Sequence, residues 1–126
     1  MASRHEDWMR QANKDLEHAR RSSDVGDYEW ACFAAQQSGE KAVKAVYQKI
    51  GADAWGHTIT GLLQKLPTHM QPPPELLDYA RELDKCYIPP RYPNAHPAGA
   101  PMDYYTKAEA ERAIEHAERI IRFCES

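Results

Sequence analysis

The sequence predicts a single all-helical domain over residues 1–126, an antiparallel bundle of about five helices with one long loop before the last helix. Three observations lead to this prediction. Apolar residues recur at the spacing of a buried helix face in several segments. No segment alternates apolar and polar residues over enough positions to build a sheet. A length of 126 residues corresponds to about one domain.

The first two predicted helices form a hairpin. One covers residues 4–25 and the other covers residues 28–50, and each has an apolar stripe at helical spacing. Gly26 ends the first helix, and Asp27 is the expected N-cap of the second. Because the break between them is so short, the two helices are expected to run antiparallel.

Small residues are frequent on the apolar side of the second predicted helix. Gly39 lies in the middle of this helix, where glycine is unfavourable, so we expect it to have a packing role. The chain contains 18 alanines, whereas leucine, isoleucine and valine together contribute 16 residues. This composition predicts closely packed helices that bury rather little aliphatic surface, and association into a homodimer would add to that burial.

Three further helices are predicted in the second half of the chain. A short one runs from Ile59 to Leu66, with Thr58 as its cap. A fourth, over residues 75–84, follows a run of three prolines, which a first helical turn tolerates. The last helix begins after Thr106, which forms a capping box with Glu109.

Composition argues against several kinds of function. The formal net charge is −3, so the chain has no overall basic character and is not expected to bind duplex DNA. No apolar segment is long enough to cross a bilayer, and the polar N-terminal residues do not resemble a signal peptide. The three cysteines and the histidines show no metal-ligand spacing. We therefore expect a cytoplasmic protein with reduced thiols, no metal, no cofactor and no membrane association.

Residues 85–105 form the one long segment without helical periodicity, and they are the best candidate for a functional surface. The segment holds five of the nine prolines and four tyrosines. The Arg91 guanidinium could bind a phosphate, and a tyrosine could stack on a base. His96 could act as a general base or acid. The tyrosines concerned are Tyr87, Tyr92, Tyr104 and Tyr105.

Structural interpretations of the same residues remain open. Arg91 could pair with Asp84 or Glu82 and hold the loop against the fourth helix, and the tyrosines could cover a thin core. His57, beside the Thr58 cap, could make a polar contact at a helix end or take part in catalysis. Glu40 and Lys44 are spaced as an i,i+4 ion pair. For that pair we expect a surface or interface contact rather than a catalytic diad.

Several segments, taken in order, resemble HEPN domains, and the resemblance covers nearly the whole chain. The matching stretches are Gly26–Gln37, Glu40–Ala45, His57–Ile59 with Leu62-Leu63, Leu83-Asp84, Tyr87–Pro89, Arg91–Asn94, Tyr105-Thr106 and the alanine-spaced last helix. The resemblance implies an antiparallel helical bundle that is usually dimeric. It also implies roles in nucleotide or RNA biology and frequent pairing with a minimal nucleotidyltransferase.

Many members of that family are toxins that cut RNA without metal, with an arginine followed four to six residues later by a histidine. Arg91 and His96 have this spacing. In such members the arginine stabilises the phosphate and the histidine activates the ribose 2′-hydroxyl, with both protomers contributing. Here Tyr92 stands where a small polar residue is usual. The Arg-Tyr-Pro-Asn stretch is closer to the RYPD branch, in which a downstream histidine is not a fixed feature.

Three functional hypotheses follow. The first is a dimeric HEPN protein that binds a nucleotide or RNA and acts with a nucleotidyltransferase partner, as in a toxin–antitoxin-like pair. The second is a metal-independent endoribonuclease that uses Arg91 and His96. The third is a purely structural interaction protein. For nucleotide or phosphate binding the candidate residues are Arg91, Tyr92, Tyr87, Asp84, Tyr104, Tyr105 and His57.

Overall fold

The computed structural model describes residues 3–126 and begins with the predicted hairpin. Helix α1 runs from His5 to Asp24 and helix α2 from Tyr28 to Ile50. Gly26 and Gly51 have the left-handed backbone conformation, with φ of 86° and 70°, which glycine adopts without steric cost. Asp27 is the N-cap residue of α2 as predicted, but its side chain makes no capping hydrogen bond. The predicted hairpin is therefore confirmed, although the expected hydrogen bond from the α2 backbone to the Asp27 side chain does not form.

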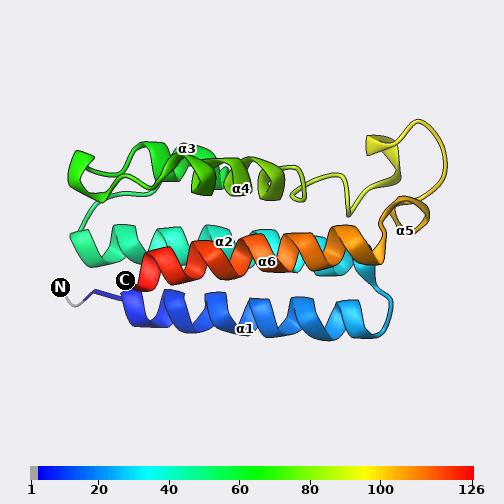
Figure 1. Ribbon diagram of the computed structural model, residues 1–126, viewed down its shortest axis with the longest axis horizontal. Helices are drawn as coiled ribbons and strands as arrows, with labels where there is room; N and C mark the ends of the chain where they lie inside the picture. Colours follow the sequence, from blue (N-terminus) through cyan, green and yellow to red (C-terminus); the bar gives the residue numbers. More distant parts are fainter. Residues whose placement is uncertain (1–2) are drawn as a thin grey trace.

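Three of the later helices pack against α2 on two sides (Figure 1). Helix α3 runs from Ile59 to Gln64 and helix α4 from Pro74 to Asp84, and the two form a layer above α2 in this view. Helix α6, from Lys107 to Glu125, lies beside α2 and also contacts α1 and α4. The all-helical bundle predicted from the sequence is confirmed, and residues 3–126 contain no strand.

Two of the predicted helix caps form as expected. The Thr58 hydroxyl accepts a hydrogen bond from the Gly61 amide at the start of α3. At the start of α6, the Thr106 hydroxyl accepts from the Glu109 amide at 3.1 Å. Local side-chain chemistry thus fixes where these helices begin.

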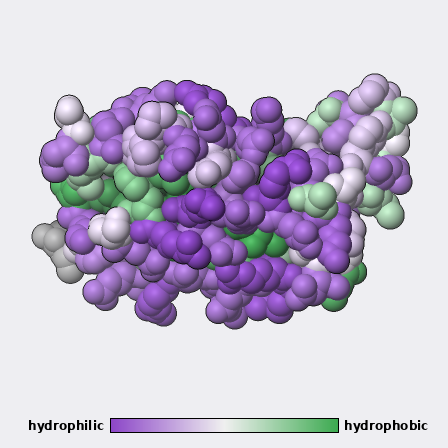
Figure 2. Space-filling model, in the orientation of Figure 1, coloured by the Kyte–Doolittle hydropathy of each residue, from purple (hydrophilic) through white to green (hydrophobic). Residues whose placement is uncertain are grey.

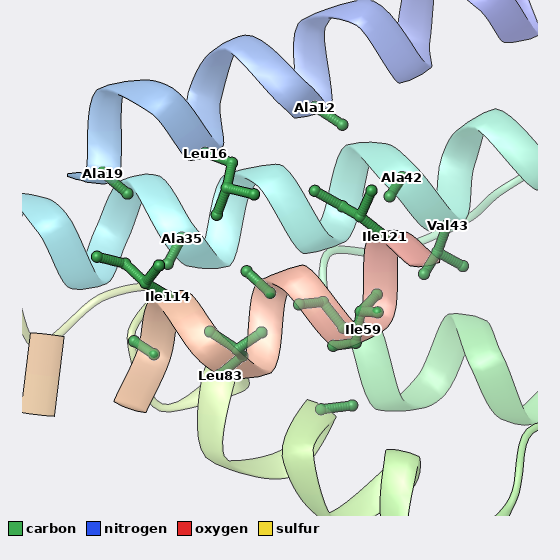
Figure 3. Close-up of a cluster of buried hydrophobic side chains, with 14 of the residues drawn as sticks. Ala12, Leu16, Ala19, Ala35, Ala42, Val43, Ile59, Leu83, Ile114 and Ile121 are labelled. Carbon is green, nitrogen blue, oxygen red and sulfur yellow. The ribbon is translucent and has the colours of Figure 1, made fainter. Parts of the chain in front are cut away.

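Gly39 has the packing role that its position predicted. A Cβ atom there would lie 2.9 Å from Ile59 Cδ1, 3.4 Å from Leu83 Cδ1 and 3.8 Å from Ile120 Cδ1. These three side chains come from α3, α4 and α6, so Gly39 is the point where all three helices approach α2. Figure 3 shows the surrounding core, in which alanines of α1 and α2 face isoleucines of α6. The core is built largely from small residues, as the composition indicated.

The connections between the later helices contain short turns that the sequence did not predict. Thr68–Met70 forms a 3-10 turn between α3 and α4. Between α4 and α6, Pro93–Ala95 forms a second 3-10 turn and Pro101–Tyr104 forms the short helix α5. This last connection projects at the end of the molecule where α2 and α6 begin (Figure 1). In Figure 2 it carries a mixture of hydrophilic and hydrophobic residues, whereas most of this face is hydrophilic.

Among residues 3–126, no helix is both long enough and apolar enough to span a bilayer.

Candidate functional site

Aromatic rings surround the guanidinium of Arg91. Its central carbon lies 4.3 Å from the ring centre of Phe33, 4.8 Å from that of Tyr87 and 5.2 Å from that of Tyr92. The Arg91 Nε–H also donates a hydrogen bond of 2.8 Å to the Tyr87 carbonyl oxygen. These contacts hold the cation in a fixed place by cation–π attraction. We call Arg91, Phe33, Tyr87 and Tyr92 the Arg91 cluster.

The Arg91 cluster replaces the ion pair that one interpretation of the sequence expected. Within residues 3–126, Arg91 forms no ion pair with Asp84 or Glu82, and the two terminal nitrogens of its guanidinium have no hydrogen-bond partner. Arg91 is half-buried and Tyr92 is exposed. A phosphate could therefore reach a guanidinium that is already oriented, and it would bring the missing hydrogen-bond acceptors.

His57 continues the aromatic row beyond Tyr87. The two rings stack nearly parallel, with centres 5.5 Å apart and planes 13° apart. His57 Nδ1 lies 3.3 Å from Glu40 Oε2, and the histidine side chain is 64% exposed. The contact with Glu40 fits a polar contact at a helix end, and the exposed ring near Arg91 fits a part in catalysis. Both roles considered for His57 therefore stay open.

Glu40 is the buried anchor of a polar network on α2. Its Oε2 accepts a hydrogen bond of 2.8 Å from Lys44 Nζ, and its Oε1 accepts one of 3.1 Å from Gln36 Nε2. The Glu40 side chain is 8% exposed and that of Lys44 is 16% exposed. The ion pair predicted from the i,i+4 spacing forms, but Glu40 is buried within this chain, so the surface alternative was wrong, while the interface alternative stays a prediction. Glu40 is buried because α2 is central in the bundle and has neighbours on several sides.

Asp84 has a structural contact at the start of α3. Its carboxylate oxygens accept hydrogen bonds from the backbone amides of Ile59, at 2.7 Å, and of Thr60, at 3.1 Å. These amides have no partner within their own helix, because they lie in its first turn. Asp84 thus ties the end of α4 to the beginning of α3, instead of pointing toward the Arg91 guanidinium.

The remaining predicted site residues form a second group inside the loop, which we call the His96 cluster. The ring of His96 stacks on that of Tyr104, with centres 4.4 Å apart, and meets the ring of Tyr105 edge-on at 6.1 Å. His96 Nε2 donates a hydrogen bond of 2.8 Å to the Pro89 carbonyl oxygen, which can only accept. Tyr104 donates to the Ala98 carbonyl oxygen. Burial raises the pKa of Tyr105.

The contacts of His96 predict a role in holding the loop together. We expect His96→Ala to lower the free energy of unfolding by about 1 kcal/mol, through loss of one hydrogen bond and one aromatic contact. We also expect chymotrypsin to cleave faster within residues 85–105, because the loop would open more often. Mass spectrometry of timed digests measures the rate of cleavage within this segment. The control is His18→Ala, at an exposed position of α1, and equal cleavage of the two variants would contradict the prediction.

Two aromatic residues of the site were not found from the sequence. Phe33 lies under the Arg91 guanidinium, and Trp30 meets the Phe33 ring edge-on with centres 6.2 Å apart. Trp30 is 50% exposed. Their one signal in the sequence is an i,i+3 aromatic pair beside the small-residue stripe of the second helix. That pattern is equally typical of a core face, so it did not identify them.

The protein is an all-helical bundle in which a C-terminal helix packs on a long helical hairpin. Its candidate site lies in the loop before that helix and is centred on Arg91. The chain belongs to the HEPN domain family, whose sequence pattern it matches over residues 5–126.

Solved structures of similar sequence share this fold. The crystal structure of TT1696 from Thermus thermophilus is 48% identical, with 98% of each chain covered and a TM-score of 0.96. ST0689, an archaeal HEPN homologue, is 44% identical over 98% of this chain and 97% of its own, with a TM-score of 0.83. The HEPN domain protein TM0613 from Thermotoga maritima is 47% identical over 94% of each chain, with a TM-score of 0.77.

A relative with a functional name was also found. The protein named "Putative toxin MJ1304" of Methanocaldococcus jannaschii is 27% identical to this chain over 123 residues, which are 90% of this chain and 81% of the relative.

Proposed function

We propose that this protein binds a nucleotide unit, free or within RNA, at the Arg91 cluster, and acts as one component of a toxin–antitoxin-like pair. The observation that carries the proposal is the oriented Arg91 guanidinium, whose terminal nitrogens have no protein partner among the described residues. In this arrangement Arg91 takes the phosphate by paired charged hydrogen bonds. The exposed rings of Tyr92 and Trp30 lie nearby and offer a surface on which a base stacks.

Binding at this cluster is tested with two arginine variants. We expect Arg91→Ala to weaken binding of single-stranded RNA, ATP or GTP at least tenfold, because charged hydrogen bonds contribute about 1.5–3 kcal/mol each. Fluorescence anisotropy measures RNA binding, and isothermal titration measures mononucleotide binding.

The chain contains a matched control for this test. Arg119 also lies over an aromatic ring, with its central carbon 5.4 Å from the ring centre of Tyr79, but on α6. Arg119→Ala removes a cation–π contact of the same type and should leave affinity unchanged. If none of the three ligands binds, or if the two alanine variants bind alike, the proposed function is wrong.

The proposed assembly is a homodimer that also contacts a minimal nucleotidyltransferase. Support for association comes from large apolar side chains that are exposed in the single chain: Ile88, 44% exposed, and Tyr92, 46% exposed, lie close together in the loop, and Trp55, 76% exposed, follows α2. Light scattering of the purified chain measures its mass in solution. Co-expression with a tagged nucleotidyltransferase encoded beside it should give a stable complex, and a monomer that does not co-purify would contradict this part of the proposal.

A second candidate function is metal-independent cleavage of RNA. It was predicted for Arg91 with His96, but His96 Nε2 is engaged by the Pro89 carbonyl and its ring is stacked on Tyr104. The observation that favours cleavage is instead the presence of another histidine, His57, against the same Tyr87 ring as Arg91.

A purely structural role for the loop predicts that Arg91→Ala lowers the melting temperature without changing any binding.

A further inference from the structure

Two cysteine thiols from distant parts of the sequence line one small cleft. Cys32 lies in the second turn of α2, and Cys86 lies in the turn that follows α4, where its amide donates to the Leu83 carbonyl oxygen at 2.8 Å. Ala113 and His116 of α6 line the same cleft. Its volume is about 200 Å³, below the roughly 300 Å³ at which pockets for drug-sized ligands begin. The cleft therefore admits molecules of the size of hydrogen peroxide rather than a nucleotide.

Contacts of the neighbouring residues bring the chain together at the two cysteines. Phe33 directly follows Cys32 on α2. Its ring contacts that of Tyr87, which directly follows Cys86, with ring centres 6.2 Å apart. Tyr105 lines the same cleft, and burial followed by the two nearby thiols raises its pKa. The two sulfurs therefore lie close to each other within the cleft.

The two cysteines differ in their access to solvent. Cys86 is half-buried, so a small oxidant from solution reaches its sulfur. Cys32 is 1% exposed, and a hydrogen bond with the Cys86 thiol, followed by burial, raises the pKa of its own thiol. The thiolate is the form that reacts with oxidants, so Cys32 is the poorer first target. Oxidation therefore begins at Cys86, with Cys32 beside it as the second thiol.

We propose that Cys32 and Cys86 form a dithiol oxidation site, at which a hydroperoxide converts the two thiols to one disulfide that ties the loop to α2. All three cysteines are thiols in the structure, which is the reduced state of this site. Disulfides in reducing compartments are usually transient ones that respond to oxidants. The inference concerns the mobility of the loop and does not depend on the proposed binding of nucleotides.

The reaction with hydrogen peroxide balances in two steps. The Cys86 sulfur bonds to one peroxide oxygen, the bond between the two oxygens breaks, and the other oxygen leaves as water, which gives a sulfenic acid. The Cys32 sulfur then bonds to the Cys86 sulfur, and the sulfenic hydroxyl leaves with the Cys32 proton as a second water. Each cysteine loses one hydrogen atom, and the peroxide is reduced by two electrons. Reducing thiols reverse the change by thiol–disulfide exchange.

The disulfide acts on the loop at the loop's first turn. Cys86 is the second residue of the segment 85–105, and Tyr87 beside it carries the guanidinium of Arg91 over its ring. In the reduced protein only non-covalent contacts hold this turn against α2. A covalent bond from α2 to Cys86 restricts how often the start of the loop opens, without touching Arg91 itself.

The test oxidises the full chain with hydrogen peroxide, blocks the remaining thiols and maps the peptides without reduction. We expect one linked peptide pair that joins Cys32 to Cys86, lighter by two hydrogen atoms than the two reduced peptides and separated by dithiothreitol. The oxidised protein should melt roughly 5 °C or more above the reduced protein, because a disulfide restricts the unfolded chain. Chymotrypsin should cleave within residues 85–105 at least about threefold more slowly.

Single variants test the order of the two steps. Cys32→Ala leaves the Cys86 sulfenic acid without a second thiol, so dimedone, which traps sulfenic acids, should label Cys86. Cys86→Ala should leave Cys32 unlabelled because that thiol is buried. Peroxide should not slow the cleavage of the Cys86→Ala loop, which controls for oxidation of methionines.

The third cysteine provides a matched control. Cys124 lies in the last turn of α6, about 17 Å along the helix from Ala113 at 1.5 Å per residue. That distance is too great for a disulfide with either thiol of the cleft. Cys124→Ala should therefore form the disulfide between Cys32 and Cys86 as the wild-type protein does.

The readouts distinguish the oxidation site from its effect on the loop. Oxidation of Cys86 to sulfinic acid with no linked peptide, or a disulfide that includes Cys124, would overturn the site. A disulfide between Cys32 and Cys86 that leaves loop cleavage unchanged would overturn its effect on the loop. If Cys32→Ala fails to fold, peptide mapping of the wild-type protein decides the proposal. None of these measurements uses a nucleotide, so failure of the proposed function would leave this inference in place.

Discussion

Replacing Gly39 by leucine is expected to destabilise the protein by about 3 kcal/mol or more, which lowers the melting temperature by roughly 10 °C. Even the first added carbon would lie 2.9 Å from Ile59 Cδ1 and 3.4 Å from Leu83 Cδ1. A leucine adds three further carbons at the point where α3, α4 and α6 approach α2. The loss outweighs the gain of about 1 kcal/mol in helix propensity over glycine. Thermal and urea unfolding followed by circular dichroism measure the change.

A matched control separates this packing effect from the effect of adding an apolar side chain to α2. Lys49→Leu introduces the same residue at an exposed position in the last turn of that helix, and its effect should stay within about 0.5 kcal/mol. Gly39→Ala should lie between the two, because the flexible end of Ile59 can move away from a single methyl group. Unchanged stability of Gly39→Leu would mean that the helices do not meet closely at this residue.

The features that the sequence predicted correctly are those set by neighbouring residues. Thr58 and Thr106 cap helices because their hydroxyls reach amides three positions further along. Gly39 was recognised because a glycine within a helix needs a reason beyond helix propensity. The short helix α5 was missed because its four residues carry no periodicity, and Pro101 at its start is also typical of an irregular loop.

The candidate site was predicted only in part, because its contacts join residues that are distant in the sequence. Arg91 and Tyr87 were identified within one proline-rich segment, and the structure does bring them together. Phe33 comes from α2, and no local pattern connects it to Arg91. His96 was paired with Arg91 by spacing alone, but the fold of the loop turns its ring toward Pro89 and Tyr104.

Asp84 is a residue that the sequence placed in the candidate site but that contacts the backbone of another helix in the structure. The family resemblance grouped it with the residues expected to face a nucleotide, and its partners, the amides of Ile59 and Thr60, lie about 25 positions earlier in the sequence. Hydrogen bonds over such a separation depend on how α3 and α4 pack, which no local pattern records. The Leu83-Asp84 pair therefore fits a packing role: Leu83 is fully buried, and Asp84 caps the neighbouring helix.

We expect Asp84→Ala to lower the free energy of unfolding by about 2–4 kcal/mol and to leave nucleotide or RNA affinity unchanged. The substitution removes a charged acceptor from two backbone amides at the start of α3, and each amide left without a partner costs about 1–3 kcal/mol. It also releases the only side-chain hydrogen bonds that join the end of α4 to α3 within residues 3–126. Urea unfolding gives the stability, and anisotropy with labelled RNA gives the affinity.

Two comparisons make the Asp84 prediction specific. Thr58→Ala removes the neighbouring local cap, whose hydrogen bond of 3.3 Å is long and exposed, and should cost about 0.5–1 kcal/mol. Asp84→Asn keeps one acceptor oxygen and should lose about half as much stability as Asp84→Ala. Arg91→Ala provides the contrasting pattern, a large loss of affinity with a smaller loss of stability. A stable Asp84→Ala protein that no longer binds would instead place Asp84 in the nucleotide site, as the family resemblance implied.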